Sequence, residues 1–399
     1  MRAHSIDRSS DVARPEDSGM NRARPNPAVS GSAERIAAID AARGVAMILV
    51  CVSHIRIHFV DTAPSLYWAL TFVSRIATPT FLLLSGFVAA YVLSSDRADV
   101  RIRLIDRGLC VLLVGHFALN LEDLREVDPW LWIFGRVTVT DAIGLCLIIA
   151  PLAQRLATGS LAILGIACVV LSWPIAMTLA PESSLGGYAA AAFFAVRSEE
   201  NALIDAAIAP YLGAFMLGMA LSKYTLADLR NQRTHQAMRK LALYGTAALI
   251  VVALGMGGWI GLKAAGMTPS DPQTVELLRR ALDPRSKLPP APAYLALYGG
   301  TGLLIAAIFL NARPRSIVEP IVQWTSTLGR ASLMCFIVQD WILRLVPAVT
   351  GIEQKTSMAF WFAYLLLTVW ILHWLATRWD TARANRFLTV GLRPRPFMA

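Results

Sequence analysis

The sequence predicts an all-α, polytopic membrane protein with about ten transmembrane helices and both termini in the cytoplasm. Three observations support this fold class. Hydrophobic residues make up 56% of the 399 residues and charged residues only 16%, a balance unlike that of soluble domains. Most of the apolar residues fall into runs near the length of about 20 residues that a helix needs to cross a bilayer. Arginine and lysine gather in short loops between these runs, as they do in membrane proteins.

The apolar runs divide the chain into one membrane domain and two polar tails. Residues 1–33 are rich in arginine, proline, serine and aspartate, so we expect a disordered cytoplasmic tail. Residues 34–380 should form the transmembrane domain, and residues 381–399 a cytoplasmic C-terminal tail. The predicted spans cover approximately residues 41–60, 66–94, 108–121, 138–154, 159–180, 207–222, 241–262, 294–312, 328–348 and 358–377.

The loops between the spans predict the orientation. Basic residues fill the loops at 97–107 and 223–240, and these alternate with less basic loops. The positive-inside rule therefore places both termini in the cytoplasm, with an even number of spans. One loop on the opposite side, residues 263–292, breaks the pattern because it carries four basic residues near its end. Long loops count for less in this rule, so the orientation is kept.

Several other classes of protein do not fit these residues. The net charge is +10, but no basic face carries interleaved aromatic residues, so we do not expect nucleic-acid binding. The five cysteines lie inside apolar runs without the spacing of metal ligands or of a disulfide framework. We therefore expect them to pack in the interior, and we expect no metal site. The sequence contains no phosphate loop, dinucleotide fingerprint, GxSxG elbow or HExxH motif.

The stretch at residues 35–58, which enters the first span, contains the strongest candidate site. Asp40, Arg43 and His54 fall at helical spacings and share one face. Arg43 and His54 are 11 residues apart, or about 16 Å along a helix axis. Arg43 should therefore lie near one interface and His54 deep in the membrane. An ionisable group at that depth costs free energy and usually serves a function.

Other polar residues lie within the predicted spans. We expect Arg75, Ser85 and Asp141 to contact substrate together with Asp40, and Pro79 should kink or break the second span. An alternative for several of them is a polar contact or ion pair between neighbouring helices. That alternative applies to Arg75, His116, Asp340, Arg344 and His373.

The chemistry of the first helix suggests group transfer. A histidine in a membrane cavity can act as a general base on a hydroxyl or amine, or can accept an acyl group transiently. Arg43 suits an anionic donor such as a nucleotide-bearing acyl thioester, because a guanidinium binds phosphate with two parallel hydrogen bonds. We therefore expect Arg43 and His54 to be the catalytic residues.

The first helix resembles the opening of the membrane acyltransferase superfamily, which includes the acyltransferase-3 family and the relatives of heparan-α-glucosaminide N-acetyltransferase. The shared pattern is Arg-x-x-x-hydrophobic-Asp-x-x-Arg-Gly followed by a histidine, with ten residues between the second arginine and the histidine, and Arg43 and His54 fit it. Further similar segments follow in the usual order. They are RIATPTFLLLSGF (75–87), RLIDRGLCVLLVGH (103–116), TDAIGLCLIIAPLA (140–153), IAPYLGAFMLGMALSK (208–223), SKLPPAPAYLALYGG (286–300) and LGRASLMCFIVQDWIL (328–343).

The resemblance implies a multi-pass protein of the cell inner membrane with no bound cofactor. Its donor would be acyl-CoA, commonly acetyl-CoA, and its acceptor a carbohydrate or a lipid-linked sugar. In the acyltransferase-3 family the histidine is the proposed catalytic residue and the arginine its partner, which points to His54 and Arg43. One segment departs from the family pattern. Members often carry a histidine in the late helix, where this chain has Gln339 and Asp340.

Two functions outside catalysis also fit intramembrane arginine, aspartate and histidine residues. A secondary transporter shows such residues together with proline and glycine breaks. A permease that exports an acyl donor for another enzyme would combine both roles. Against a transporter, the two halves of the chain show no repeat. A purely structural membrane protein would gain little from a deep histidine aligned with an interfacial arginine.

Overall fold

The structure is a computed structural model. It describes residues 36–59, 63–95, 97–121, 133–178, 185–194, 206–287, 289–312, 316–352 and 357–381. The predicted tails at 1–33 and 381–399 lie outside the described residues, apart from residue 381 at the end of the last helix.

The described elements are helices, which confirms the all-α fold class. The first half of the chain forms α1 (Ala37–Ile55), η1 (Arg56–Phe59), α2 (Pro64–Ser74), α3 (Ala77–Leu93), α4 (Ala98–Cys110), η2 (Val111–Gly115), α5 (His116–Asn120), α7 (Val139–Ala153), α8 (Thr158–Thr178) and α9 (Leu185–Phe194). The second half forms α10 (Ile208–Arg230), α11 (Thr234–Ala264), α12 (Pro272–Ala281), α13 (Pro292–Leu310), α14 (Val318–Arg330), α15 (Ser332–Asp340), η4 (Trp341–Leu345), α16 (Val346–Thr350) and α17 (Met358–Thr381).

Seven helical stretches of the described chain are long and apolar enough to cross a membrane. They are Ala37–Phe59, Pro64–Leu93, Thr158–Ala176, Thr234–Ala264, Pro292–Leu310, Ser332–Thr350 and Met358–Trp379. The chain is thus a polytopic membrane protein by helix length and composition.

The other three predicted spans also fall on helices, but each has a feature that sets it apart from the seven. The span at 108–121 runs from the end of α4 through η2 to α5, and α4 is a charged, amphipathic helix. The span at 138–154 is α7, which has only 15 residues. The span at 207–222 is the apolar part of α10, whose second half carries charged residues from Lys223 onward.

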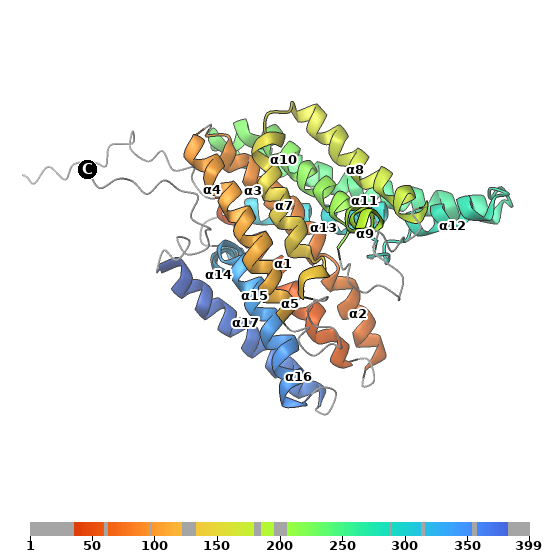
Figure 1. Ribbon diagram of the computed structural model, residues 1–399. Helices are drawn as coiled ribbons and strands as arrows, with labels where there is room; N and C mark the ends of the chain where they lie inside the picture. The colour runs from red at the N-terminus through yellow and green to blue at the C-terminus, as the bar shows by residue number, and fades with distance from the viewer. Residues whose placement is uncertain are drawn as a thin grey trace, which may run out of the picture. The chain divides into compact units, whose positions relative to one another are not determined.

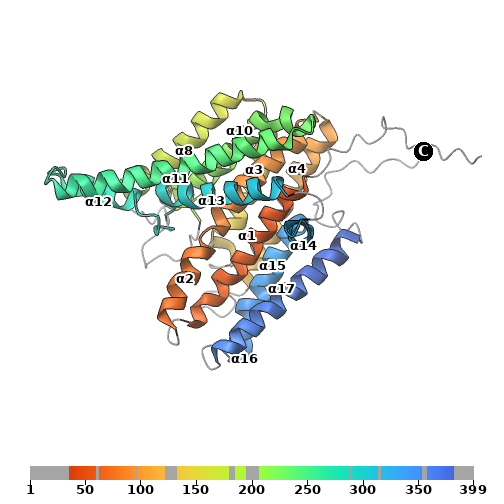
Figure 2. The same ribbon diagram turned by 180° about the vertical axis from the view of Figure 1, so that it is seen from behind.

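Helix α1 is surrounded by α2, α3, α13, α14, α15 and α17, so the candidate helix lies in the interior of the bundle (Figure 1 and Figure 2). Two glycines allow α1 and α14 to pack backbone to backbone. A Cβ atom at Gly44 would overlap the carbonyl oxygen of Thr325, and one at Gly329 would overlap that of Asp40. This close packing fixes the first turns of α1, which carry Asp40 and Arg43.

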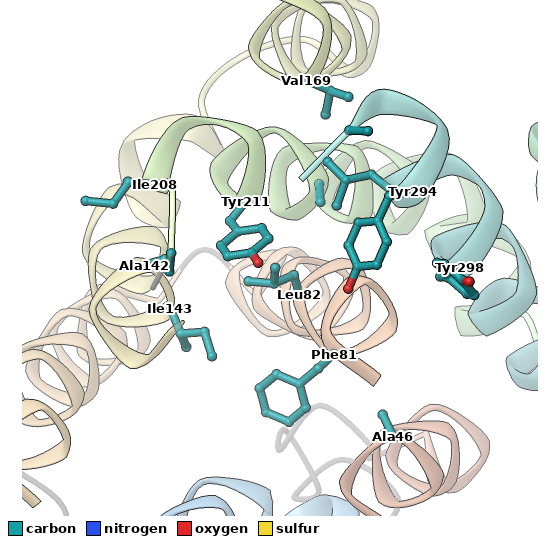
Figure 3. Close-up of a cluster of buried hydrophobic side chains, with 14 of the residues drawn as sticks. Ala46, Phe81, Leu82, Ala142, Ile143, Val169, Ile208, Tyr211, Tyr294 and Tyr298 are labelled. Atoms are coloured by element: carbon teal, nitrogen blue, oxygen red, sulfur yellow. The ribbon is translucent and has the colours of Figure 1, made fainter. Parts of the chain in front are cut away.

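A second close approach joins α3 to α10. A Cβ atom at Gly86 would overlap the carbonyl oxygen of Phe215, and one at Gly218 would overlap that of Leu83. A hydrophobic cluster lies beside this contact and includes Leu82 of α3, Tyr211 of α10 and Tyr294 of α13. Figure 3 shows the rings of both tyrosines near Leu82. These contacts fix the position of α3 beside α1.

The predicted break near Pro79 is present. Helix α2 ends at Ser74 and α3 begins at Ala77, with Arg75 in the turn between them. Proline lacks the N–H that would bond to the carbonyl four residues earlier, and its ring crowds that carbonyl. The carbonyl in question belongs to Arg75, and it accepts a hydrogen bond from the Tyr294 hydroxyl at 3.3 Å instead. The break therefore places Arg75 at a bend beside α13.

Two helices contain π-helical turns, at Val111–Gly115 between α4 and α5 and at Trp341–Leu345 after α15. A π turn inserts one residue into a helix, widens it locally and is frequent at functional sites. The second of these turns begins immediately after Asp340. Both turns lie on elements that line the cavities described next.

Candidate active site

Three cavities lie around α1. The first, which we call the arginine cavity, has a volume of about 160 Å³. It contains Arg43 of α1, Arg107 of α4 and Arg330 of α14, and Ser85 of α3 also lines it. Three guanidinium groups in one cavity favour a ligand with several negative charges, because arginine binds phosphate oxygens through paired hydrogen bonds.

The contacts that hold Arg43 in this cavity include two polar contacts and one with an aromatic ring. Its Nη2 donates a hydrogen bond to Ser332 Oγ at 2.8 Å, and its Nη1 lies 3.5 Å from the carboxylate of Asp40. Its guanidinium group also lies over the ring of Phe81, 5.3 Å from the ring centre. Asp40 is buried and lines none of the three cavities. Asp40 therefore orients Arg43 in this structure, whereas it was expected to contact substrate.

The second cavity, which we call the histidine cavity, has a volume of about 250 Å³. His54 of α1 and Asp340 of α15 line it, together with Asn120, Arg136 and Arg344 among others. His54 Nδ1 lies 2.9 Å from Asp340 Oδ1, and Arg344 Nη1 lies 3.6 Å from the same oxygen. The histidine thus meets a carboxylate that is itself close to a cation.

The side chains of His54 and Asp340 differ in how far they are exposed. The side chain of Asp340 is 4% exposed, whereas that of His54 is 22% exposed toward the cavity. Among the residues that the structure describes, Nε2 of His54 has no hydrogen-bond partner. The carboxylate beside Nδ1 favours a proton on that nitrogen, which leaves Nε2 as the basic atom. The same carboxylate would stabilise an imidazolium if Nε2 accepted a proton from a substrate.

A second histidine–carboxylate pair lies nearby and differs in one respect. His116 Nδ1 lies 2.9 Å from Asp141 Oδ1, and His116 Nε2 lies 2.9 Å from the carbonyl oxygen of Ile133. Both ring nitrogens therefore face acceptors, and neither is open to a substrate. Asp141 also accepts hydrogen bonds from the backbone and side chain of Thr138, which caps α7. Thr138 itself lines the histidine cavity, so Asp141 supports its wall.

The arginine cavity and the histidine cavity lie along the same elements. Helix α1 contributes Arg43 to the first cavity and His54 to the second, and α7, α15 and the consecutive helices α4, η2 and α5 also line both. For the arginine cavity these elements give Leu104 and Arg107 (α4), Ile143 and Leu147 (α7), and Ser332–Met334 (α15). For the histidine cavity they give Leu119 and Asn120 (α5), Val139 (α7), and Phe336 and Asp340 (α15). The two cavities thus lie at successive levels between the same helices, about 16 Å apart along α1.

The third cavity, which we call the basic cavity, has a volume of about 330 Å³. Arg75 lines it, together with Arg56, Arg285 and Lys287. Lys287 also lines the histidine cavity, so the two cavities adjoin. The predicted residues therefore divide among three places. Arg43 and Ser85 share the arginine cavity, His54 lies in the histidine cavity, and Arg75 lies in the basic cavity.

Several cavity residues were not singled out as site residues from the sequence. Arg107 and Arg330 were seen only as loop charges or as parts of a motif, and Arg56 and Lys287 were likewise not assigned a role. Asp340 was noted as a candidate for an ion pair, and the structure gives it His54 as a partner. A usable signal existed for Arg107, since it lies near the cytoplasmic end of a predicted span, at the same level as Arg43.

Comparison with known protein families gave one match. Residues 36–377 match the sequence model of the family Acyl_transf_3, described as an acyltransferase domain. The matched region includes all the residues that line the basic and histidine cavities and all but one of those that line the arginine cavity. A comparison with curated proteins gave no match, and neither did a comparison with solved structures.

Proposed function

The chain belongs to the acyltransferase-3 family, and from this premise we propose that it transfers an acyl group from cytosolic acyl-CoA to a carbohydrate or glycolipid acceptor. The acyl group is expected to be acetyl. The observation that carries the proposal is the alignment of the arginine cavity with the His54–Asp340 pair along α1. One cavity suits the phosphates of the donor, and the other suits a reaction that needs a base.

The donor would bind with its phosphates in the arginine cavity. Arg43, Arg107 and Arg330 supply the charge, and the apolar residues of α7 and α15 line the path toward His54. A donor that is anionic at one end and reactive at the other matches this arrangement. Acyl-CoA has this form, because its phosphates and its thioester are separated by a long, uncharged arm.

The reaction would take place beside His54. The acceptor hydroxyl or amine attacks the thioester carbonyl carbon while Nε2 of His54 takes its proton. The carbon–sulfur bond then breaks, and the thiolate leaves as free CoA after it receives that proton from His54. Asp340 holds the imidazolium during the step, as a carboxylate does in other histidine-based mechanisms. Arg344 and Arg136 lie in the same cavity and would stabilise the negative charge on the carbonyl oxygen.

The cavities fit the membrane arrangement that the loop charges predict. We propose ten spans with both termini in the cytoplasm, in the cell inner membrane. Arg43, Arg107 and Arg330 then lie at the cytoplasmic ends of their spans, where CoA is available. His54, Arg136 and Lys287 lie toward the outer face, where an extracytoplasmic glycan would arrive.

The direct test measures thiol release from acetyl-CoA by purified protein in detergent, with amino sugars and glucans as acceptors. We expect His54→Ala to lower turnover by about 100-fold or more and to remain folded. We expect Arg43→Gln to act mainly on the KM for the donor, with an increase of about tenfold to a hundredfold, because a hydrogen bond to a charged group contributes about 1.5–3 kcal/mol.

The matched control is His235→Ala. His235 is exposed on α11 and lies outside the three cavities, so its removal should leave the rate unchanged. Undiminished acyl transfer by folded His54→Ala protein would refute the proposed mechanism. A complete lack of thiol release from folded wild-type protein with every donor would favour the transporter, which needs cavities but no base.

A further inference from the structure

The basic cavity has a composition that the donor site does not explain. Its eight described lining residues are four cations and four serine or threonine residues. Arg56, Arg75 and Lys287 are half-buried, and Arg285 is exposed. None of the eight is acidic or apolar. Side chains that all present N–H or O–H donors around one space favour an oxyanion.

The positive charge in this cavity is only partly balanced by the described residues. Arg285 pairs with Asp283 at 3.0 Å, but no described carboxylate lies within ion-pair distance of Arg56 or Arg75. Nη1 of Arg56 donates instead to the hydroxyls of Tyr67 and Thr71. Like charges gathered in a half-buried space raise the free energy of the empty cavity, and a bound anion would offset that cost.

The pKa of Asp283 reflects the same concentration of positive charge. Partial burial alone would raise the pKa of this loop carboxyl. The hydrogen bonds and charge of Arg285 and the charge of Arg75 outweigh burial and lower the pKa below its usual value. Asp283 is therefore ionised near neutral pH and is already engaged with Arg285.

The location ties this cavity to the acceptor rather than to the donor. Ser53 lines the basic cavity and the next residue, His54, lines the histidine cavity, while Lys287 lines both. The donor phosphates already have a site at Arg43, about 16 Å away along α1. The basic loop at 263–292 also broke the positive-inside pattern. Two of its cations, Arg285 and Lys287, line this cavity.

We propose that the basic cavity binds an oxyanion group of the acceptor, a phosphate or a carboxylate, and thereby presents a neighbouring hydroxyl or amine to His54. The acceptor is accordingly an anionic saccharide or a phosphate-linked one. This inference rests on the proposed acyltransferase function for the reaction itself. The binding of the anion does not depend on that function and can be measured separately.

The first experiment measures binding without catalysis. Purified protein is treated with an amine-acylating reagent, and modification of Lys287 is followed by mass spectrometry with and without inorganic phosphate. We expect phosphate to slow modification of Lys287 by threefold or more, and to leave Lys263 unaffected because that lysine is exposed at the end of α11. Protection should be lost in Arg75→Gln and retained in Arg280→Gln, whose exposed side chain pairs with Glu276 outside the cavity. Arg56→Gln serves if Arg75→Gln does not fold.

The second experiment compares three acceptors, a neutral hexose, the corresponding uronic acid and the hexose phosphate. We expect kcat/KM to be at least tenfold higher for one or both of the charged acceptors, which also identifies the anion. The ratio of kcat/KM for the charged acceptor to kcat/KM for the neutral acceptor should fall toward one in Arg75→Gln. It should be partly restored in Arg75→Lys.

Three results would overturn the proposal. The first is equal use of neutral and charged acceptors, the second is failure of phosphate to protect Lys287, and the third is protection of Lys287 by free CoA near the donor KM. If no acyl transfer occurs but phosphate still protects Lys287 in an Arg75-dependent manner, the reaction is wrong and the anion site stands.

Discussion

Among the residues that the structure describes, His54 and His116 each meet a carboxylate, and their surroundings differ. His116 uses both ring nitrogens to contact Asp141 and the Ile133 carbonyl, so it is a structural link between α5 and α7. His54 contacts Asp340 through Nδ1, and its side chain lines the histidine cavity. The sequence predicts His54 rather than His116 as the catalytic histidine because His54 shares a face with Arg43. The contact of Asp340 with His54 could not be predicted from the sequence, because residues 54 and 340 are brought together only by the fold.

Asp340→Asn tests this pairing at the level of one residue. The amide keeps the shape of the side chain but cannot stabilise an imidazolium as a carboxylate does. We expect the rate of thiol release to fall by about 100- to 10,000-fold, with the KM for acetyl-CoA changed much less. Steady-state kinetics of purified protein would show this split. An unchanged kcat would mean that Asp340 has only a structural role.

At the scale of helices, the apolar runs predicted where helices lie better than how many of them are long enough to span a membrane. All ten predicted runs fall on helices, yet only seven are long and apolar enough to count as spans. The three runs that do not qualify lie on α4, α7 and α10. These helices carry charged residues or end early, and their polar ends line cavities or make other contacts. Pro79 correctly predicted the break between α2 and α3 from local chemistry. No local sequence pattern predicted the two π-helical turns.

The contact between α1 and α14 offers a test at this scale. Gly329→Ala would place a methyl group against the carbonyl oxygen of Asp40. We expect destabilisation of about 1–3 kcal/mol, as for other forced insertions into packed interiors, and a lower Tm in detergent. Gly257→Ala is the matched control on α11, because no neighbouring atom lies within 4 Å of its Cβ position. A Tm for Gly329→Ala equal to that of wild type would contradict the close packing.

At the scale of the whole molecule, the orientation predicted from the loop charges places the three cavities at different depths. The arginine cavity lies at the basic ends of the predicted spans, whereas the basic cavity lies toward the loop that violates the positive-inside rule. The membrane class could be predicted because it follows from composition, and the orientation stays a prediction from the loop charges. The three cavities could not be predicted, because their walls come from helices that are distant in the chain.

Lysine labelling tests the orientation. Lys263 and Lys240 lie at opposite ends of α11, which is long enough to span the bilayer. A membrane-impermeant amine reagent added to intact cells should modify Lys263, and should modify Lys240 only after the membrane is permeabilised. Lys240 also pairs with Asp228 at 2.7 Å, so its labelling should be slow even then. Labelling of Lys240 in intact cells would reverse the proposed topology.

The most direct test of acyl transfer across the bilayer uses sealed vesicles that contain the purified protein. Acetyl-CoA labelled in its acetyl group is added outside, and the acceptor is trapped inside. We expect labelled acceptor in the lumen and free CoA thiol outside, in equal amounts, with both products lost in His54→Ala. Intact labelled acetyl-CoA in the lumen, with no acylated acceptor and no effect of His54→Ala, would contradict an acyltransferase and identify a transporter.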